Sequence, residues 1–152
     1  MALTMTKTFL WLDDLRNPFL GTWIKPEYSD HRIIWVLNYD QFVEWIKANG
    51  LPNIISFDHD LADEHYTPEK YWNDYDRSKE YQDSKTYTEK TGHECAKWLV
   101  NYCQSHGLDL PNYLVHSFNP VGADNIRGIL ESYKKFINNQ DHIWSIIEDG
   151  IK

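Results

Sequence analysis

Residues 53–60 read NIISFDHD, an apolar run that passes directly into three ionisable side chains. Two other short apolar runs also end in polar residues: KTFLWL at 7–12 precedes Asp13, and YLV at 113–115 precedes His116. Short apolar runs bounded by polar residues are typical of buried strands. The sequence therefore predicts three strands, each of which carries polar, chemically active groups at its carboxyl end.

Helical patterns alternate with these strands. Another run, RIIWVL at 32–37, predicts a strand, and Asp40 is expected to cap the helix after it, which Gly50 ends. The capping box TGHE at 91–94 predicts the start of a second helix, and apolar residues at helical spacing over 126–137 predict a third. Alternating strands and helices predict an α/β fold with a mostly parallel sheet of four to five strands, in which ligands bind at the carboxyl ends of the strands.

The size and composition of the chain fit one globular domain that covers residues 1–152. Of the 152 residues, 41% are hydrophobic and 25% are charged, which is typical of a protein with a packed core. Residues 62–90 are different, because acidic and aromatic side chains are frequent there and aliphatic ones are few. We predict a partly helical insertion whose aromatic residues cover the domain, form a dimer contact or close over a ligand. The tail at 142–147 fits either a last strand or a short helix.

The charge of the chain limits its partners. A formal net charge of -8 argues against binding to duplex DNA, which rewards a basic surface. A small phosphorylated substrate remains compatible with this charge, because a bound cation reverses the local field. No apolar run approaches the roughly 20 residues of a membrane-spanning helix, and Cys95 and Cys103 are spaced too far apart on one predicted helix for a disulfide. We expect a cytoplasmic protein without a membrane partner, and the sequence leaves a homo-oligomer open.

Four carboxylates at the strand ends form a candidate metal site. They are Asp13, Asp14, Asp58 and Asp60. Carboxylates that meet repel one another, so they need a cation or a shared proton. Oxygen-rich sites suit hard divalent ions, and Mg²⁺ or Mn²⁺ is the expected cofactor. The alternative for Asp13 and Asp14 is a purely structural role, in which their side chains cap backbone amides in the turn after the strand.

Two histidines at the strand ends add acid–base chemistry. His59 and His116 titrate near neutrality unless perturbed, so with Asp58 they are the candidate catalytic residues. His59 is equally compatible with a role as a metal ligand. The loop HSFNPVG at 116–122 precedes a predicted helix, whose first N–H groups can hold an anion. The candidate phosphate-binding residues of this loop are Ser117, Asn119 and Gly122, the last leaving the backbone free to approach a ligand.

Four segments carry a resemblance to a known family. They read FLWLDDLRNP, ISFDHDL, TGHECAKWL and HSFNPVGADNIRGIL, and they span residues 9–130. Their order and spacing resemble the cyclic-phosphate processing receiver-like domain family of bacteria and bacteriophages. The resemblance implies a receiver-like (flavodoxin-like) three-layer sandwich and a role in handling cyclic phosphates on nucleotides or RNA ends. The family's functional positions correspond to Asp13, Asp14, Arg16, Asp58, His59, Asp60, His116, Ser117 and Asn119.

The chain departs from its relatives in two ways. The insertion at 62–90 replaces a connection that the family usually keeps short. Receivers of two-component signalling, which share an acidic pair after the first strand and an aspartate after the third, also need a lysine after a fifth strand. We find no convincing candidate for that lysine, which disfavours a role in a phosphorelay.

Three functions are compatible with these residues. The first is a metal-assisted phosphodiesterase, in which the carboxylates hold the ion, His59 and His116 share acid and base roles, and Arg16, Ser117 and Asn119 grip phosphate oxygens. The second is a binding module that captures a nucleotide without cleaving it. The third is a degenerate receiver used for protein interaction. The ionisable groups favour an enzyme over the third function, because clustering them without a ligand costs stability.

Overall fold

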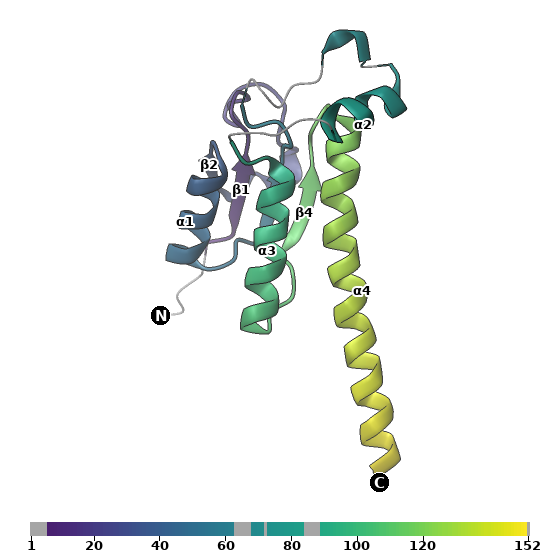
Figure 1. The fold of residues 1–152 in the computed structure, drawn as a ribbon. Helices are drawn as coiled ribbons and strands as arrows, with labels where there is room; N and C mark the ends of the chain where they lie inside the picture. Colours follow the sequence, from purple (N-terminus) through teal and green to yellow (C-terminus); the bar gives the residue numbers. More distant parts are fainter. Residues whose placement is uncertain (1–5, 63–67, 72, 84–88, 152) are drawn as a thin grey trace.

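The strands of the chain form one all-parallel sheet in the order β2-β1-β3-β4 (Figure 1). The computed structural model describes residues 6–62, 68–71, 73–83 and 89–151, with only the backbone of residues 69 and 140–151. The elements are β1 (Thr8–Leu12), η1 (Pro26–Tyr28), β2 (Arg32–Val36), α1 (Tyr39–Asn49), β3 (Ile54–Phe57), η3 (Glu69–Tyr71), α2 (Tyr75–Asp83), α3 (Gly92–His106), β4 (Asn112–Val115) and α4 (Pro120–Ile151). Within the described residues, this order is that of the first four strands of a flavodoxin-like sheet, and it confirms the predicted fold class.

The two faces of the sheet are covered differently. Alternate side chains of β1 point to opposite faces, so Leu10 and Leu12 lie in the main core with α1, α3 and α4, and α3 lies between the other two (Figure 1). Phe9 and Trp11 lie on the second face. That face is covered by the β1–β2 connection, in which Tyr28 of η1 packs against Phe9 and its apolar neighbours. The third layer is therefore an irregular segment with a single turn of 3-10 helix, since prolines and glycine interrupt a longer helix there.

Helix ends follow the sequence signals in part. Asn38, rather than Asp40, caps α1, because its side chain accepts the N–H of Gln41 at 2.9 Å. Asp40 lies inside the first turn, since β2 ends at Val36 and the helix begins earlier than predicted. Thr91 is the N-cap of α3, but its side chain makes no capping hydrogen bond. The capping box therefore predicts correctly where α3 begins, while the hydrogen bond typical of such a box is not formed.

Two segments extend beyond the sheet and its covering helices. The described part of the insertion forms η3 and α2, and α2 docks on the start of α4 through a hydrogen bond from the Tyr75 hydroxyl to Asp124 (2.8 Å). The rest of the insertion, at 63–67, 72 and 84–88, lies outside the described residues. The tail whose structure the sequence left open is helical, because α4 runs for 32 residues, and Figure 1 shows its C-terminal half beyond the sheet.

Two expectations about the chain as a whole can be compared with the structure. Cys95 and Cys103 are both buried in α3 and neither is in a disulfide. Among the described helices, none is at once long and apolar enough to cross a membrane.

Candidate functional site

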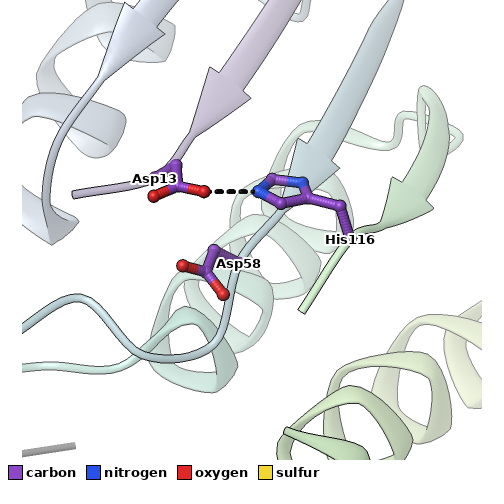
Figure 2. A group of neighbouring side chains, drawn as sticks. All are labelled: Asp13, Asp58 and His116. Carbon is purple, nitrogen blue, oxygen red and sulfur yellow. Dashed lines mark hydrogen bonds and ion pairs between the residues drawn. The ribbon is translucent and has the colours of Figure 1, made fainter. Parts of the chain in front are cut away.

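Three residues that follow three neighbouring strands meet at one edge of the sheet. The last residues of β1, β3 and β4 are paired in register, so Asp13, Asp58 and His116 come next to one another. Each offers one ligand atom, and these atoms lie within 4.8 Å of one another (Figure 2). Parallel pairing thus brings together residues that are more than a hundred positions apart in the chain. We call these three residues the strand-end cluster.

Asp13 is both a turn cap and a site residue. Its Oδ1 accepts the backbone N–H groups of Leu15 (2.8 Å) and Arg16 (2.9 Å). Its Oδ2 faces the cluster, where Arg16 Nη1 and His116 Nε2 each lie 3.0 Å away. Burial by itself raises the pKa of Asp13, but the hydrogen bonds from His116 and the two backbone groups outweigh burial and lower it. Asp13 is therefore ionised at neutral pH. Its Oδ1 fills the structural capping role, and its Oδ2 lies among the strand-end cluster, where the metal-binding role stays a prediction.

His116 is held on three sides. Its Nε2 faces Asp13, its Nδ1 lies 2.7 Å from the hydroxyl of Ser56, and its ring stacks on Trp11 with centroids 3.9 Å apart and planes 5° apart. Burial lowers the pKa of His116, and the neighbouring Asp13 opposes this in part. A neutral imidazole that donates from Nε2 to Asp13 accepts the Ser56 hydroxyl at Nδ1. Because a hydroxyl donates or accepts, Ser56 supports either tautomer of His116.

The carboxylate of Asp58 has fewer stabilising contacts than that of Asp13. Its Oδ1 accepts the N–H of His59 at 2.9 Å, and its Oδ2 lies 3.8 Å from Arg16 Nη1. Burial, followed by the charge of Asp13, raises the pKa of Asp58 to about 7, and Arg16 offsets this only in part. A carboxyl group in this state holds a proton near neutrality or needs a further cation.

Arg16 links the cluster to an aromatic rim. Its guanidinium faces both carboxylates, and its Cζ lies 4.3 Å from the ring centre of Phe118 and 5.5 Å from that of Trp23. The side chain is 19% exposed, so it is reachable from solvent. This position suits the phosphate-binding role that the sequence predicts for Arg16.

His59 and Asp60 form a separate buried unit with Asn119 and Gly122. His59 Nδ1 lies 2.8 Å from Asp60 Oδ1, and Asn119 Nδ2 donates to the same oxygen at 3.1 Å. Asn119 Oδ1 accepts the N–H of Gly122 at 3.0 Å, which caps the first turn of α4. The His59 ring packs so closely on Gly122 that an added Cβ there would lie 2.3 Å from the ring. The structure thus fills the space over Gly122 with a side chain and uses Asn119 as a cap.

A polar hollow of about 500 Å³ adjoins His59, and none of the strand-end cluster residues lines it. His59, Thr91 and His93 are among the residues that line it. Burial is the main reason that the pKa of His93 is lowered, with Lys97 and His59 adding to the effect. His59 is therefore directed toward surroundings that differ from those of the strand-end cluster.

Two further candidates lie beside the cluster without joining it. Asp14 is half-buried directly after Asp13, and among the described residues it is not one of the three whose ligand atoms converge. Ser117 Oγ accepts the N–H of Asn119 at 3.0 Å and so stabilises the turn before α4.

A comparison with known protein families found one match. The model of the cyclic-phosphate processing receiver domain matches residues 8–132. The chain belongs to this family. No curated protein and no solved structure matched the chain. The match covers all four strands and every residue of the strand-end cluster, and it ends inside α4. The sheet of this family member ends at β4 within the described residues, so the lysine position after a fifth strand of a receiver has no counterpart there.

The cluster fits a divalent metal ion. Asp13, Asp58 and His116 are close enough to hold one, and a bound cation would offset the burial and the like charge of Asp13 that raise the pKa of Asp58. An imidazole among carboxylates suits Mn²⁺ or Zn²⁺ as well as the harder Mg²⁺. Asp60, which the sequence adds to the metal ligands, is instead hydrogen-bonded to His59 and Asn119.

Sequence reasoning missed the residues that orient the cluster. Ser56 holds His116, and Trp11 Nε1 donates to the carbonyl of Arg16 at 2.9 Å. Trp35 Nε1 donates to the carbonyl of Asp13 at 2.7 Å. One signal was present, since Ser56 is the single polar residue inside the fully buried strand β3. A lone hydroxyl in such a strand needs a partner, and the nearest strand end supplies His116.

Proposed function

We propose that the protein is a cyclic phosphodiesterase that hydrolyses a cyclic phosphate of a nucleotide or an RNA end at the strand-end cluster. The observation that carries the proposal is the convergence of Asp13, Asp58 and His116 beside the guanidinium of Arg16. In the reaction a water oxygen attacks phosphorus, one P–O bond of the ring breaks, and the water proton reaches the leaving oxygen. The site must therefore hold the phosphate, move a proton and stabilise negative charge.

Arg16 is suited to hold the phosphate. A guanidinium binds phosphate oxygens through two parallel N–H groups, and it keeps its charge at every relevant pH. Its contacts with Asp13 and Asp58 aim it at the cluster, and the partial exposure of its side chain leaves access for a ligand.

Asp58 and His116 are suited to move the proton. A carboxyl group whose pKa lies at about 7 takes up and releases protons at neutral pH, which is the condition for efficient acid–base catalysis. The lowered pKa of His116 keeps its imidazole neutral, and Ser56 and Trp11 fix its orientation. Environments that drive two titratable groups in opposite directions are typical of an acid–base pair. With a divalent ion bound, Asp13, Asp58 and His116 would instead act as its ligands, and the ion would supply Lewis-acid charge at the phosphate.

The test is hydrolysis of a panel of cyclic phosphates. The panel contains RNA oligonucleotides with a 2′,3′-cyclic phosphate end, nucleoside 2′,3′-cyclic phosphates, 3′,5′-cyclic mononucleotides, cyclic dinucleotides and cyclic ADP-ribose-type compounds. Each is incubated with Mg²⁺, Mn²⁺, Zn²⁺ or EDTA and with the wild type, Asp58→Asn or His116→Ala. Asp76→Asn, on the exposed surface of α2, is the matched control.

The proposal expects turnover of one substrate class by the wild type and the control, and its loss in both cluster variants. Each positioned acid or base contributes roughly 10²–10⁴ in rate. If no compound is turned over but one binds tightly and is recovered intact, the protein is a nucleotide-binding module and the hydrolase proposal is wrong.

A further inference from the structure

Exposed apolar side chains surround Arg16 at the edge of the strand-end cluster. Phe118 is 77% exposed although it lies between Ser117 and the buried Asn119, and Trp23 is 46% exposed. Both rings lie over the same guanidinium. Exposed apolar groups gathered beside a polar site mark a ligand-binding surface more often than scattered ones do. Neither ring is needed to fill the core at these exposures, so they are available to a ligand.

The carboxylates of the strand-end cluster and the two rings lie on the same arginine side chain. Arg16 Nη1 lies 3.0 Å from Asp13 and 3.8 Å from Asp58, while its Cζ lies 4.3 Å from the Phe118 ring centre. The rings are therefore one guanidinium away from the carboxylates. In a nucleotide, one ribose separates the phosphate from the base. A base that is one ribose away from a phosphate held at Arg16 can therefore reach the rim formed by Phe118 and Trp23.

We propose that Phe118 and Trp23 form a nucleobase subsite, in which the base of the substrate stacks on Phe118. This inference rests on the proposed function for the position of the phosphate. Stacking tolerates any base, because every base has a π-face, so the subsite selects nucleoside and single-stranded RNA substrates over cyclic phosphates that lack a base. A base must be unpaired to stack in this way, which agrees with the net charge of -8 and its unsuitability for duplexes.

A simpler role for the two rings is to position Arg16 by cation–π contact. The two roles differ in one measurable way. A ring that only positions Arg16 affects every phosphate substrate equally. A ring that stacks on a base affects only substrates that carry one.

The experiment compares adenosine 2′,3′-cyclic phosphate with methyl riboside 2′,3′-cyclic phosphate, which has no base. The variants are Phe118→Ala, Phe118→Tyr and Trp23→Ala, and the control is Phe136→Ala, which removes an exposed ring on α4. Phe118→Ala should lower kcat/KM for the nucleoside substrate by roughly 5- to 150-fold and leave the base-free substrate unchanged. Phe118→Tyr should restore the preference. An equal loss on both substrates, or no loss on either, overturns the subsite.

A binding measurement separates this inference from the hydrolase proposal. The dissociation constant of 3′-AMP is measured by calorimetry beside that of ribose 5-phosphate. Tighter binding of 3′-AMP that Phe118→Ala removes supports the subsite even if nothing is hydrolysed. Equal affinity for the two compounds in the wild type, or binding of neither, overturns it even if a cyclic phosphate is turned over.

Discussion

Asp58 and Asp60 are two positions apart in one segment, yet they belong to regions with opposite properties. Asp58 faces Asp13 and His116 at the edge of the sheet, where burial and like charge raise its pKa to about 7. Asp60 is enclosed by hydrogen bonds from His59 and Asn119. In the first region, the contacts of Arg16 and His116 do not fully offset the charge of the two carboxylates. In the second region, the Asp60 carboxylate is hydrogen-bonded and packed inside the protein. The comparison teaches that a run of ionisable residues after a strand need not form a single site, because successive residues turn to different surroundings.

Metal binding gives the largest expected difference between the regions. At pH 7.5 the wild type should bind one Mn²⁺ or Zn²⁺ ion, and Asp58→Asn or His116→Ala should weaken binding by about 100-fold or more, since each removes a ligand. Because protons compete for Asp58 below its pKa of about 7, the affinity should fall as the pH drops from 7 to 5.5. Isothermal titration calorimetry measures both effects.

Asp60→Asn makes the same substitution as Asp58→Asn, but in the second region. Its affinity for the ion should stay within a few fold of the wild-type value. Equal loss of affinity in Asp58→Asn and Asp60→Asn would show that the two carboxylates act as one site.

Asp58 should also make stability depend on pH. Its pKa is raised from 3.8 to about 7 in the folded state, so the folded protein binds more protons than the unfolded chain between these values. The stabilisation is complete below pH 3.8 and is lost as the pH rises toward 7, at up to about 1.4 kcal/mol per pH unit from this group. Asp58→Asn removes this dependence, so the variant should gain stability over the wild type most clearly at pH 8.

The measurement is urea unfolding in EDTA at pH 6 and pH 8. Asp76→Asn, an exposed carboxylate on α2, is the control and should change neither value. A stability advantage of Asp58→Asn that is no larger at pH 8 than at pH 6 would contradict the assigned state of Asp58.

The second region should respond to overpacking. Gly122→Ala places a methyl group against the His59 ring, and such crowding costs about 1–3 kcal/mol of unfolding free energy. Gly128→Ala is the matched control on the same helix, where the added Cβ meets nothing within 4 Å, and it should stabilise by about 1 kcal/mol. Thermal unfolding compares the two. The double variant that carries both Gly122→Ala and His59→Ala should lose less unfolding free energy than the two single variants lose in sum, because the crowding ring is gone. Additive losses would show that the His59 ring does not fill the space over Gly122.

Ser56→Ala should give the smallest effect. It removes the hydrogen bond to His116 Nδ1 and should cost about 1 kcal/mol of stability. It should also change the titration of the His116 ring in an NMR spectrum, because the ring loses its hydrogen-bond partner at Nδ1. Ser78→Ala, another buried hydroxyl whose Oγ donates to the Tyr71 carbonyl, should cost similar stability without altering His116. An unchanged His116 titration in Ser56→Ala would remove Ser56 from the site.

The fold was accessible from the sequence because its signals are local. Apolar runs before Asp13, Asp58 and His116 predict the strands, and parallel pairing then places their ends together. The separation of His59 from Asp58 was not accessible in this way. It depends on the space over Gly122 in α4 and on the cap from Asn119 just before α4, which lie 63 and 60 positions beyond His59 in the chain.

The aromatic rim was hidden for the same reason. Phe118 lies in the loop HSFNPVG among polar residues, and Trp23 lies in a connection with no regular pattern. Only the position of Arg16 in three dimensions relates the two rings to the carboxylates.

The most direct test of the central claim is a comparison of two histidine variants on the cyclic phosphate that the wild type hydrolyses. The account assigns the chemistry to the strand-end cluster, so His116→Ala should lower kcat by roughly 10²–10⁴ while the protein remains folded. His59→Asn, which keeps a polar group beside Asp60, should retain turnover at temperatures where it is folded. Loss of kcat in the folded His59→Asn protein, with activity preserved in His116→Ala, would place the reaction in the hollow beside His59 and contradict the account.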